Sequence, residues 1–370
     1  MSIKVMTVFG TRPETIKMAP LVKELKSRPE IETIVCVTAQ HRQMLDQVLH
    51  AFQIVPDYDL NIMKPGQTLS DITTNVLKRL EDVIQKAKPD IVLVHGDTTT
   101  TFAGALAAFY HQVPIGHVEA GLRTYHKYSP YPEEMNRQMV GVLADLHFAP
   151  TECSRQNLLR EGKKDSSIFI TGNTAIDALK TTVQKDYKSD LLNWVGENRL
   201  IVLTAHRREN LGAPMYQMFR AIRRIIEKYS DVKVVYPVHL NPVVVEAAET
   251  VFGDCDKVRL IKPLDVIDFH NLLASSYLIA TDSGGIQEEA PSLGKPVIVL
   301  RDTTERPEGI KAGTLKLAGT NEETIFSLLD QLLCNPEEYR KMSHASNPYG
   351  DGLASKRIVD AILQYFGSLH

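Results

Sequence analysis

The feature that most constrains this chain is the alternation of short apolar runs with helical patterns along nearly its whole length. Strand-sized runs such as residues 91–94 and 297–300 are separated by longer stretches with helical spacing, such as residues 215–228. Buried strands that alternate with helices form parallel sheets with right-handed crossovers. The pattern therefore predicts an α/β fold of doubly wound parallel sheets.

The expected strands fall into two sets, which indicates two domains. The first set is 5–9, 33–38, 91–94, 115–118, 146–149 and 168–170, and the second is 200–204, 233–236, 257–260, 278–281 and 297–300. A chain of 370 residues also exceeds what one hydrophobic core comfortably holds, since domains average roughly 150 residues. We expect a Rossmann-like domain at residues 1–171, joined by a C-terminal helix at 353–370, and a second Rossmann-like domain at 172–352.

Charge and hydropathy exclude several classes of protein. The 42 Lys and Arg against 45 Asp and Glu give a net charge of −3, so the chain has no general attraction for nucleic acid or anionic lipid. The longest apolar runs fall far below the ~18 residues of a membrane helix. The first ten residues alternate like a strand rather than forming a signal peptide. We therefore expect a cytoplasmic protein with neither nucleic acid nor membrane as a partner.

The cysteines give no sign of a metal site. The four cysteines are 117, 102 and 79 residues apart, spacings unlike those of zinc or redox motifs. We expect reduced, mostly buried thiols. Because neither a dinucleotide fingerprint nor a P-loop occurs, no cofactor is expected.

Ligands of open α/β sheets bind beyond the carboxyl ends of the strands, and two such domains facing each other would form a cleft. The first candidate segment there is residues 10–17, GTRPETIK. Its glycine permits a tight turn, Pro13 suits the first helical position, and Arg12 and Lys17 bring two cations near free backbone N–H groups. The segment fits a phosphate site, and it equally fits an ordinary strand-to-helix turn with solvated charges.

Three carboxylates follow in the same half of the chain. Asp97 comes after the strand 91–94, where the commonest use of an aspartate is to cap the next helix, here beginning near Thr98. Glu119 follows the next strand in the same way, and Glu133 stands at a helix start marked by proline. Three acids at neighbouring strand or helix ends favour acid/base chemistry over capping.

The second half carries polar groups at two strand ends. His206 and Arg207 follow the strand 200–204, where they are suited to meet phosphate, and His239 follows the next strand. A lone histidine is more often structural.

A third strand end in this half carries a glycine-rich turn. Ser283, Gly284 and Gly285 open a helix after the strand 278–281, so backbone amides and the helix dipole converge on any anion there. Glu289, one turn on, is within reach of a ribose diol. A glycine-rich turn with an exposed acid is the alternative.

Seven motifs in order carry a family resemblance: GTRPETIK, HGDTTTT, HVEAGLRT, YPEEMNR, TAHRREN, TDSGGIQEEAP and RDTTERPEG. With them the chain resembles the non-hydrolysing UDP-N-acetylglucosamine 2-epimerases of bacteria over nearly its whole length. The resemblance implies a GT-B-type fold, with two Rossmann-like domains and the substrate in the cleft between them. It also implies reversible conversion of UDP-GlcNAc to UDP-ManNAc without a cofactor, by anti elimination of UDP through a 2-acetamidoglucal and re-addition. The product would supply ManNAc units for cell-surface polysaccharide.

The resemblance assigns roles by motif. It implies that Asp97, Glu119 and Glu133 are acid/base carboxylates and that His206 is an active-site histidine. The implied substrate-binding residues are Arg12, Lys17, Phe269, Ser283, Gly284, Gly285, Glu289 and Arg306.

The family also implies regulation by a second UDP-GlcNAc and a homodimer. The segments that match the activator site contain Gln40, His41, Gln43, Gln67, Arg207 and His239. Alternatives are a hydrolysing 2-epimerase, a GT-B glycosyltransferase that uses a UDP-sugar, and a catalytically silent nucleotide-sugar sensor. The sensor would keep Ser283 and Glu289 and could lose the carboxylates or His206, all of which are present.

Overall fold

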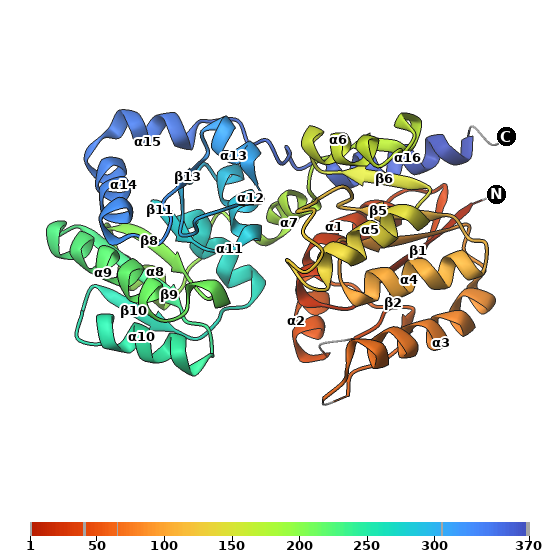
Figure 1. The fold of residues 1–370 in the computed structure, drawn as a ribbon, viewed down its shortest axis with the longest axis horizontal. Coiled ribbons are helices and arrows are strands. Elements are labelled where there is room, and N and C mark those ends of the chain that lie inside the picture. The colour runs from red at the N-terminus through yellow and green to blue at the C-terminus, as the bar shows by residue number, and fades with distance from the viewer. Residues whose placement is uncertain (1, 40–41, 65, 305, 368–370) are drawn as a thin grey trace. The chain divides into compact units, whose positions relative to one another are not determined.

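The computed structural model describes residues 2–39, 42–64, 66–304 and 306–367. The chain forms two compact units (Figure 1). The first unit is Met1–Thr181 with Tyr349–His370, and the second is Thr182–Pro348. Each unit is an α/β unit around one parallel sheet, which confirms the predicted fold class.

The first unit contains, over its described residues, a 7-stranded sheet in the order β3-β2-β1-β4-β5-β6-β7. Its strands are β1 (Ile3–Phe9), β2 (Ile31–Val37), β3 (Tyr58–Asp59), β4 (Ile91–His95), β5 (Ile115–Val118), β6 (Leu146–Ala149) and β7 (Ile168–Ile170). All of the neighbouring pairs are parallel. The carboxyl ends of β1, β4 and β5 therefore lie side by side at one edge of the sheet.

Helices cover this sheet (Figure 1). They are α1 (Arg12–Lys26), α2 (Arg42–Phe52), α3 (Leu69–Ala87), α4 (Thr99–Tyr110), α5 (Glu133–Leu143), α6 (Glu152–Arg160), α7 (Thr174–Thr182) and α16 (Ala354–Gly367), with a short 3-10 turn η1 (Asp165–Ser167). The side chains of Met6 and Val8 pack in a buried cluster with residues of α3 and α4. The strand residues face this cluster because side chains alternate between the two faces of a sheet.

The second unit holds a 6-stranded parallel sheet among its described residues, in the order β10-β9-β8-β11-β12-β13. Its strands are β8 (Arg199–Thr204), β9 (Val232–Pro237), β10 (Val258–Ile261), β11 (Leu278–Thr281), β12 (Val297–Val299) and β13 (Leu315–Leu317). Its helices are α8 (Asp190–Val195), α9 (Ala213–Lys228), α10 (Pro242–Phe252), α11 (Val266–Ser275), α12 (Gly284–Ser292), α13 (Pro307–Ala312), α14 (Glu322–Cys334) and α15 (Pro336–Ser343), with η2 (Arg208–Asn210). Ile201 and Leu203 pack in one buried cluster and Leu200 and Val202 in another, so both faces of the sheet are covered.

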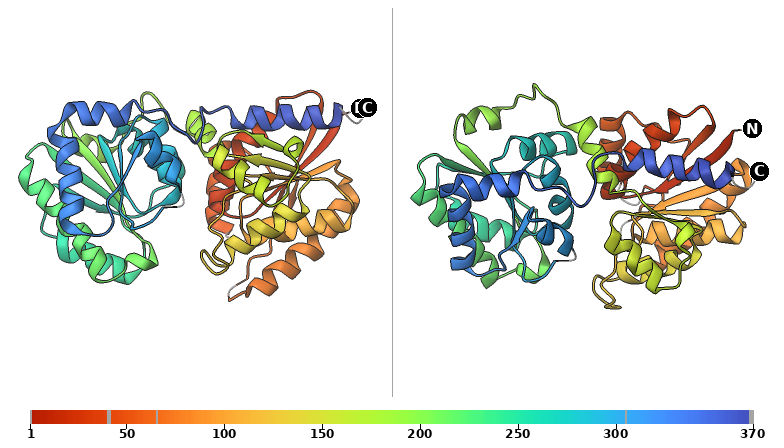
Figure 2. Two further views of the ribbon diagram at one scale, coloured as in Figure 1. Left: turned by 45° about the horizontal axis from the view of Figure 1, so that its top comes forward. Right: turned by 90° about the horizontal axis from the view of Figure 1, so that it is seen from above.

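The first unit extends further along the chain than the predicted boundary at residue 171. It includes most of α7 because Asp177 on that helix accepts backbone N–H bonds from Ala354 and Ser355 at the start of α16. The helix α16 in turn packs beside α1 (Figure 2). Arg28, just after α1, pairs with Asp360 of α16 at 2.9 Å. The C-terminal segment is thus held in the first unit at the start and in the middle of α16.

Two short strands, β3 and β13, are not predicted by the sequence. No alternating apolar pattern marks the segment containing β3, yet Tyr58 pairs with Cys36 of β2 and Asp57 accepts the N–H of Val35 at 2.8 Å. Edge strands of two or three residues carry too few residues to show an alternation.

The expectation that the thiols are mostly buried is wrong. Only Cys36 is buried among the four cysteines, whereas Cys153 and Cys334 are exposed near helix ends and Cys255 is intermediate. All four are free thiols.

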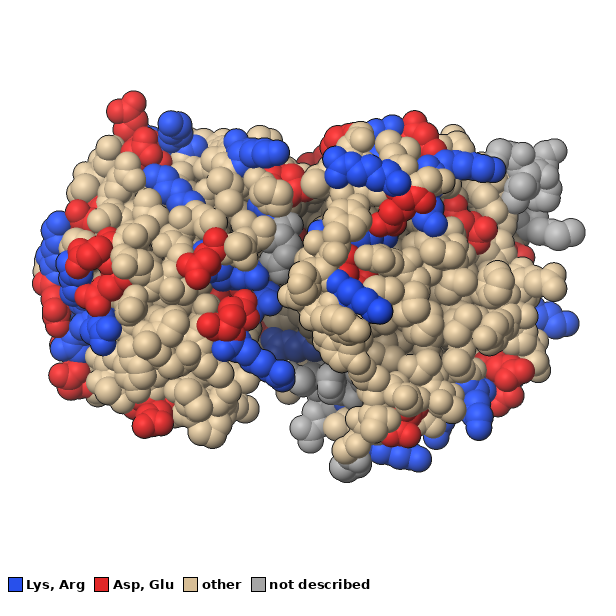
Figure 3. All heavy atoms as spheres, in the orientation of Figure 1, with Lys and Arg blue, Asp and Glu red and all other residues tan. Residues whose placement is uncertain are grey.

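None of the helices in the described ranges has the length and apolar character that a transmembrane segment requires. On the face drawn in Figure 3, basic and acidic side chains are interspersed.

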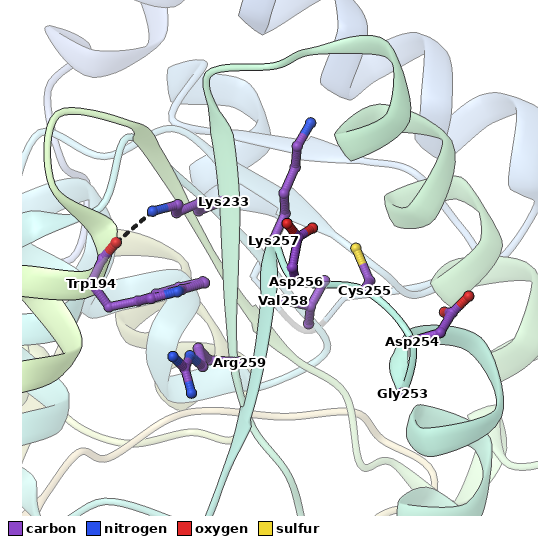
Figure 4. A pocket seen from close by; sticks show the side chains of 9 residues that line it. All are labelled: Trp194, Lys233, Gly253, Asp254, Cys255, Asp256, Lys257, Val258 and Arg259. Carbon is purple, nitrogen blue, oxygen red and sulfur yellow. Dashed lines mark hydrogen bonds between the residues drawn. The ribbon is translucent and has the colours of Figure 1, made fainter.

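A pocket of about 650 Å³ lies beside β10 (Figure 4). It is lined by Trp194, Lys233, Gly253, Asp254, Cys255, Asp256, Lys257, Val258 and Arg259. The Lys233 ammonium lies over the Trp194 ring, 4.7 Å from its centroid. Since this lining includes none of the predicted site residues, the pocket is separate from the predicted site.

Candidate active site

Glu119 is a buried and ion-paired acid of the first unit. It follows β5 directly and has a φ of 62°, in the left-handed region that non-glycine residues rarely adopt. Its side chain is 8% exposed, and its Oε2 lies 2.5 Å from Lys17 Nζ and 2.9 Å from His95 Nε2. Burial by itself would raise the pKa of Glu119, but the Lys17 ammonium and His95 hold this pKa well below its usual value. The carboxylate is therefore ionised at neutral pH.

Lys17 reaches Glu119 because of the strand order. Lys17 lies on α1 after β1, His95 ends β4, and Glu119 follows β5, so three adjacent strands deliver the three groups. The sheet thus brings Lys17 and Glu119 into contact, although they are 102 residues apart in the chain.

At residues 10–17, the expectation of free backbone N–H groups is wrong for Gly10 and Thr11. Glu14 forms a capping box with Thr11, and its Oε2 accepts the N–H groups of Gly10 and Thr11 at 3.0 and 2.7 Å. These amides are thus occupied by a carboxylate of the chain itself. Arg12 begins α1 and is half-buried.

Asp97 does not cap the helix that follows it. The N-cap of α4 is Thr98, whose hydroxyl accepts the N–H of Thr101. The Asp97 carboxylate instead binds Arg137 of α5 through Oδ2, at 2.9 Å from Nε and 2.6 Å from Nη2. Its side chain keeps 27% exposure, so it is accessible as well as ion-paired.

Glu133 differs from the other two acids. It is the first residue of α5, as predicted from the preceding proline, and it is half-buried. No described residue forms a hydrogen bond or ion pair with its carboxylate. The neighbouring Glu134 is the structural acid: it is fully buried and accepts the N–H groups of Thr124 and Tyr125 at 2.9 and 3.1 Å. Glu133 is therefore the acid without a fixed partner at this edge.

In the second unit, His206 is organised by an acid that the sequence analysis does not single out. Asp282 follows β11 and is fully buried, and its Oδ2 accepts three bonds: from the N–H groups of His206 and Arg207, both at 2.8 Å, and from the Asn210 amide at 3.1 Å. Its Oδ1 lies 3.5 Å from His206 Nδ1. Burial lowers the pKa of His206, and the Asp282 carboxylate opposes that shift. The His206 ring, 40% exposed at its side chain, also stacks on His239 at 5.6 Å.

The glycine-rich turn opens a helix as predicted. Ser283 is the N-cap of α12 without a side-chain cap bond, and Gly284 and Gly285 are the first helical residues. A Cβ on Gly284 would lie 2.6 Å from Arg306 Nη1, so the absence of a side chain lets the guanidinium lie against the helix start. Arg306 Nε also donates to the buried Glu288 at 2.6 Å. A cation and a helix N-terminus thus converge, which suits an anion.

Glu289 lies one turn further along α12 and is 9% exposed. Its Oε2 is 3.6 Å from Nε2 of His270, whose Nδ1 is 2.7 Å from the Thr182 hydroxyl. Phe269, the predicted neighbour of a base, precedes His270 on α11 and is half-buried. The three predicted nucleotide contacts Ser283, Arg306 and Glu289 are therefore gathered around the start of α12.

The residues predicted for a second UDP-GlcNAc are only partly described. Gln40 and His41 lie outside the described residues, and Gln43 lies on α2 with a side chain that is not described. Gln67 bonds within its own loop, donating to the Ile62 carbonyl at 2.8 Å. Arg207 donates its backbone N–H to Asp282, and His239 is exposed.

Sequence reasoning misses the partners that fix the candidate site: His95, Arg137, Glu134 and Asp282. All four stand inside the motifs quoted above, so the available signal is their place beside a predicted strand or helix end. The roles of Arg137 and Asp282 depend on contacts between segments 40 and 76 residues apart, which no local pattern reveals.

Comparison with known proteins identifies the family of this chain. The family model described as UDP-N-acetylglucosamine 2-epimerase matches residues 23–363. A UDP-N-acetylglucosamine 2-epimerase from Bacillus subtilis is 70% identical over 365 residues, covering 99% of this chain and 96% of the relative.

Solved structures give the same result. An S. aureus protein solved with UDP has a TM-score of 0.92 at 58% identity, covering 99% of this chain and 97% of the other. A UDP-GlcNAc 2-epimerase from Neisseria meningitidis bound to UDP-GlcNAc has a TM-score of 0.89 at 51% identity, covering 98% and 100%. The predicted GT-B-type fold class and the predicted isomerase activity are confirmed, and the chain belongs to the UDP-N-acetylglucosamine 2-epimerase family.

Proposed function

We propose that this enzyme interconverts UDP-GlcNAc and UDP-ManNAc by anti elimination of UDP, through a 2-acetamidoglucal intermediate to which UDP adds back. Family membership and the Neisseria relative bound to UDP-GlcNAc support the substrate. The observation that carries the mechanism is the different environment of the three carboxylates. Asp97 and Glu119 are paired with cations, and Glu133 has no partner among the described residues.

This difference suits an elimination. The C2 proton of the sugar is not acidic by itself, so its removal must be coupled to departure of the UDP oxygen. Asp97 and Glu119, each paired with a cation, are candidates to accept a proton, and Glu133, without such a partner among the described residues, is a candidate to deliver one. Epimerisation also needs a proton delivered to the opposite face, which requires more than one acid/base group.

The proposal assigns UDP binding to the second unit. The start of α12 with Ser283 to Gly285 and Arg306 would bind the diphosphate, and Glu289 would accept hydrogen bonds from the ribose hydroxyls. His206 would support the departing UDP oxygen, because its ring is held beside Asp282 and is partly exposed. Arg12, Lys17 and Phe269 would complete the substrate contacts.

The test follows the hydrogen at C2. Purified enzyme is incubated with UDP-GlcNAc in heavy water, and the product is analysed by NMR and mass spectrometry. We expect UDP-ManNAc with deuterium at C2, since a base that takes the proton from one face cannot return it to the other. Product with its original C2 hydrogen would refute proton abstraction. Free ManNAc with UDP would indicate the hydrolysing alternative, and transfer to an acceptor would indicate a glycosyltransferase.

The acids are tested with isosteric amides. Asp97→Asn, Glu119→Gln and Glu133→Gln should each slow turnover by roughly 10²-fold or more while UDP affinity changes little, since the amide keeps the shape but cannot exchange the proton. Release of UDP and the glycal by a variant would indicate that re-addition has been slowed.

The finer predictions on regulation and location belong to the same proposal. A second UDP-GlcNAc bound near Arg207 and His239 would act on the reaction through the stacked rings of His239 and His206. UDP-ManNAc alone should then be turned over poorly until a little UDP-GlcNAc is added, and hyperbolic kinetics without it would contradict this site. A homodimer, a cytoplasmic location and a role in surface polysaccharide remain predictions.

A further inference from the structure

Arg137 is a buried cation with one functional partner and one structural partner. Its side chain is 13% exposed, and both Nε and Nη2 bind the same oxygen of Asp97, Oδ2, at 2.9 and 2.6 Å. Its Nη1 lies 3.3 Å from Oε2 of Glu134, one turn back on α5. The Asp97 Oδ1 has no hydrogen-bond partner among the described residues.

Glu134 ties this arginine to the backbone. It is fully buried and takes the N–H groups of Thr124 and Tyr125 in addition to Arg137 and the Gln138 amide, at 2.9 Å from that amide. Its four donors satisfy both oxygens, so Glu134 is fixed and cannot swing toward a ligand. A fixed anion behind Arg137 holds the guanidinium in one position.

The Asp97 backbone is fixed from the same helix. Asn136, adjacent to Arg137, donates its amide to the Asp97 carbonyl at 2.8 Å. Gly96, just before Asp97, has its carbonyl 2.7 Å from Nε2 of His117 and a φ of 67°. Thus α5 holds both the carbonyl and the carboxylate of Asp97, and β5 holds the turn before it.

We propose that Arg137 is a positioning residue for Asp97. The two donors of Arg137 bind Oδ2 of Asp97 and so leave Oδ1 as the oxygen that exchanges a proton with the substrate. Two charged donors on one oxygen hold the carboxylate in place and stop it from rotating. Arg137 itself does not touch substrate in this scheme. The inference deepens the proposed function and rests on it, because it needs Asp97 to act in proton transfer.

A double-mutant cycle tests whether Arg137 acts through Asp97. The four proteins are wild type, Arg137→Gln, Asp97→Asn and the double variant, each assayed for kcat, KM and UDP affinity. Arg137→Gln should lower kcat on the order of 10- to 100-fold, as expected when a reacting group is misplaced. Its KM and UDP affinity should stay within about twofold of wild type, because binding groups are untouched. In the Asp97→Asn background the same change should lower kcat by less than about twofold.

Arg123→Gln is the matched control. The Arg123 side chain is fully buried and forms two bonds with the Glu161 carboxylate, at 2.7 and 2.9 Å. Arg123→Gln therefore removes a comparable ion pair elsewhere in the same unit. In the double variant Arg123→Gln/Asp97→Asn, the fold-loss of kcat should equal the product of the fold-losses in the two single variants. If the Arg137→Gln effect also multiplies, Arg137 has only a structural role and the proposal is overturned.

Two further measurements keep the test decisive. If Arg137→Gln does not fold, as judged by circular dichroism, Arg137→Lys replaces it in the cycle. Lys keeps the charge but lacks the paired N–H donors of a guanidinium. We therefore expect a smaller loss of kcat that again disappears in the Asp97→Asn background, and an unchanged kcat would overturn the proposal. Wild type is run in heavy water beside the cycle. Missing C2 deuterium there would refute the proposed function, whereas C2 deuterium with multiplying effects would refute only the role of Arg137.

Discussion

Asp282→Asn tests whether a single buried acid organises the His206 loop. The Asp282 Oδ2 accepts bonds from the backbone N–H groups of His206 and Arg207 and from the Asn210 amide. Asparagine has nearly the same shape, so the change removes the charge and leaves the packing intact. The expected effects are therefore electrostatic.

The size of the effect follows from these three bonds. A hydrogen bond to a charged acceptor contributes about 1.5–3 kcal/mol and a neutral one about 1 kcal/mol, so three weakened bonds cost roughly 3 kcal/mol. At about 2–4 °C per kcal/mol for a domain of this size, the unfolding transition of the second unit should fall by roughly 6–12 °C. Turnover should fall roughly 10-fold or more, because His206 loses the anion beside its Nδ1.

Scanning calorimetry and a coupled assay of UDP-ManNAc formation measure the two effects. Asp231→Asn is the control in the same unit: Asp231 pairs with Arg199 at 2.8 Å but is 55% exposed at its side chain, so its loss should cost less than about 1 kcal/mol. If Asp282→Asn unfolds at the same temperature as Asp231→Asn and turns over like wild type, the reasoning is refuted.

Four other outcomes are expected. Glu289→Ala should weaken UDP binding by roughly 1–3 kcal/mol, the range for charged hydrogen bonds, and unchanged affinity by calorimetry would remove Glu289 from the site. Gly284→Ala should fold normally yet weaken UDP roughly tenfold, about 1.4 kcal/mol, because its new Cβ must displace the Arg306 guanidinium; equal affinity would contradict that contact. Against the effect of burial, Lys17 holds the pKa of Glu119 well below its ordinary 4.5, so this pair stabilises the fold above that pH and less as the pH falls further. The loss of thermal stability in Lys17→Met should therefore be largest at neutral pH and shrink in acid, and a constant loss across the pH range would argue against the pair. Activity should persist in EDTA and without added NAD, and restoration by a metal ion after EDTA treatment would overturn the elimination mechanism.

The sequence by itself determines the two-unit α/β fold and the positions of the candidate groups. Strands such as β4 and β11 can be predicted from the sequence because burial on both faces of a parallel sheet requires continuous apolar residues. Polar residues just after such runs, Asp97 and Glu119 among them, must lie at the carboxyl edge. Burial and chain direction are local properties, so a one-dimensional pattern records them.

Only the tertiary structure decides which group binds which. Asp97 stands where an N-cap is expected, yet it binds Arg137 of α5, and Thr98 caps the helix instead. Lys17 pairs with Glu119 because β1 and β5 lie on either side of β4 in the sheet. Such partners depend on strand order and on the direction of each side chain, and both are set by packing between segments far apart in the chain, which leaves no periodic trace in the sequence.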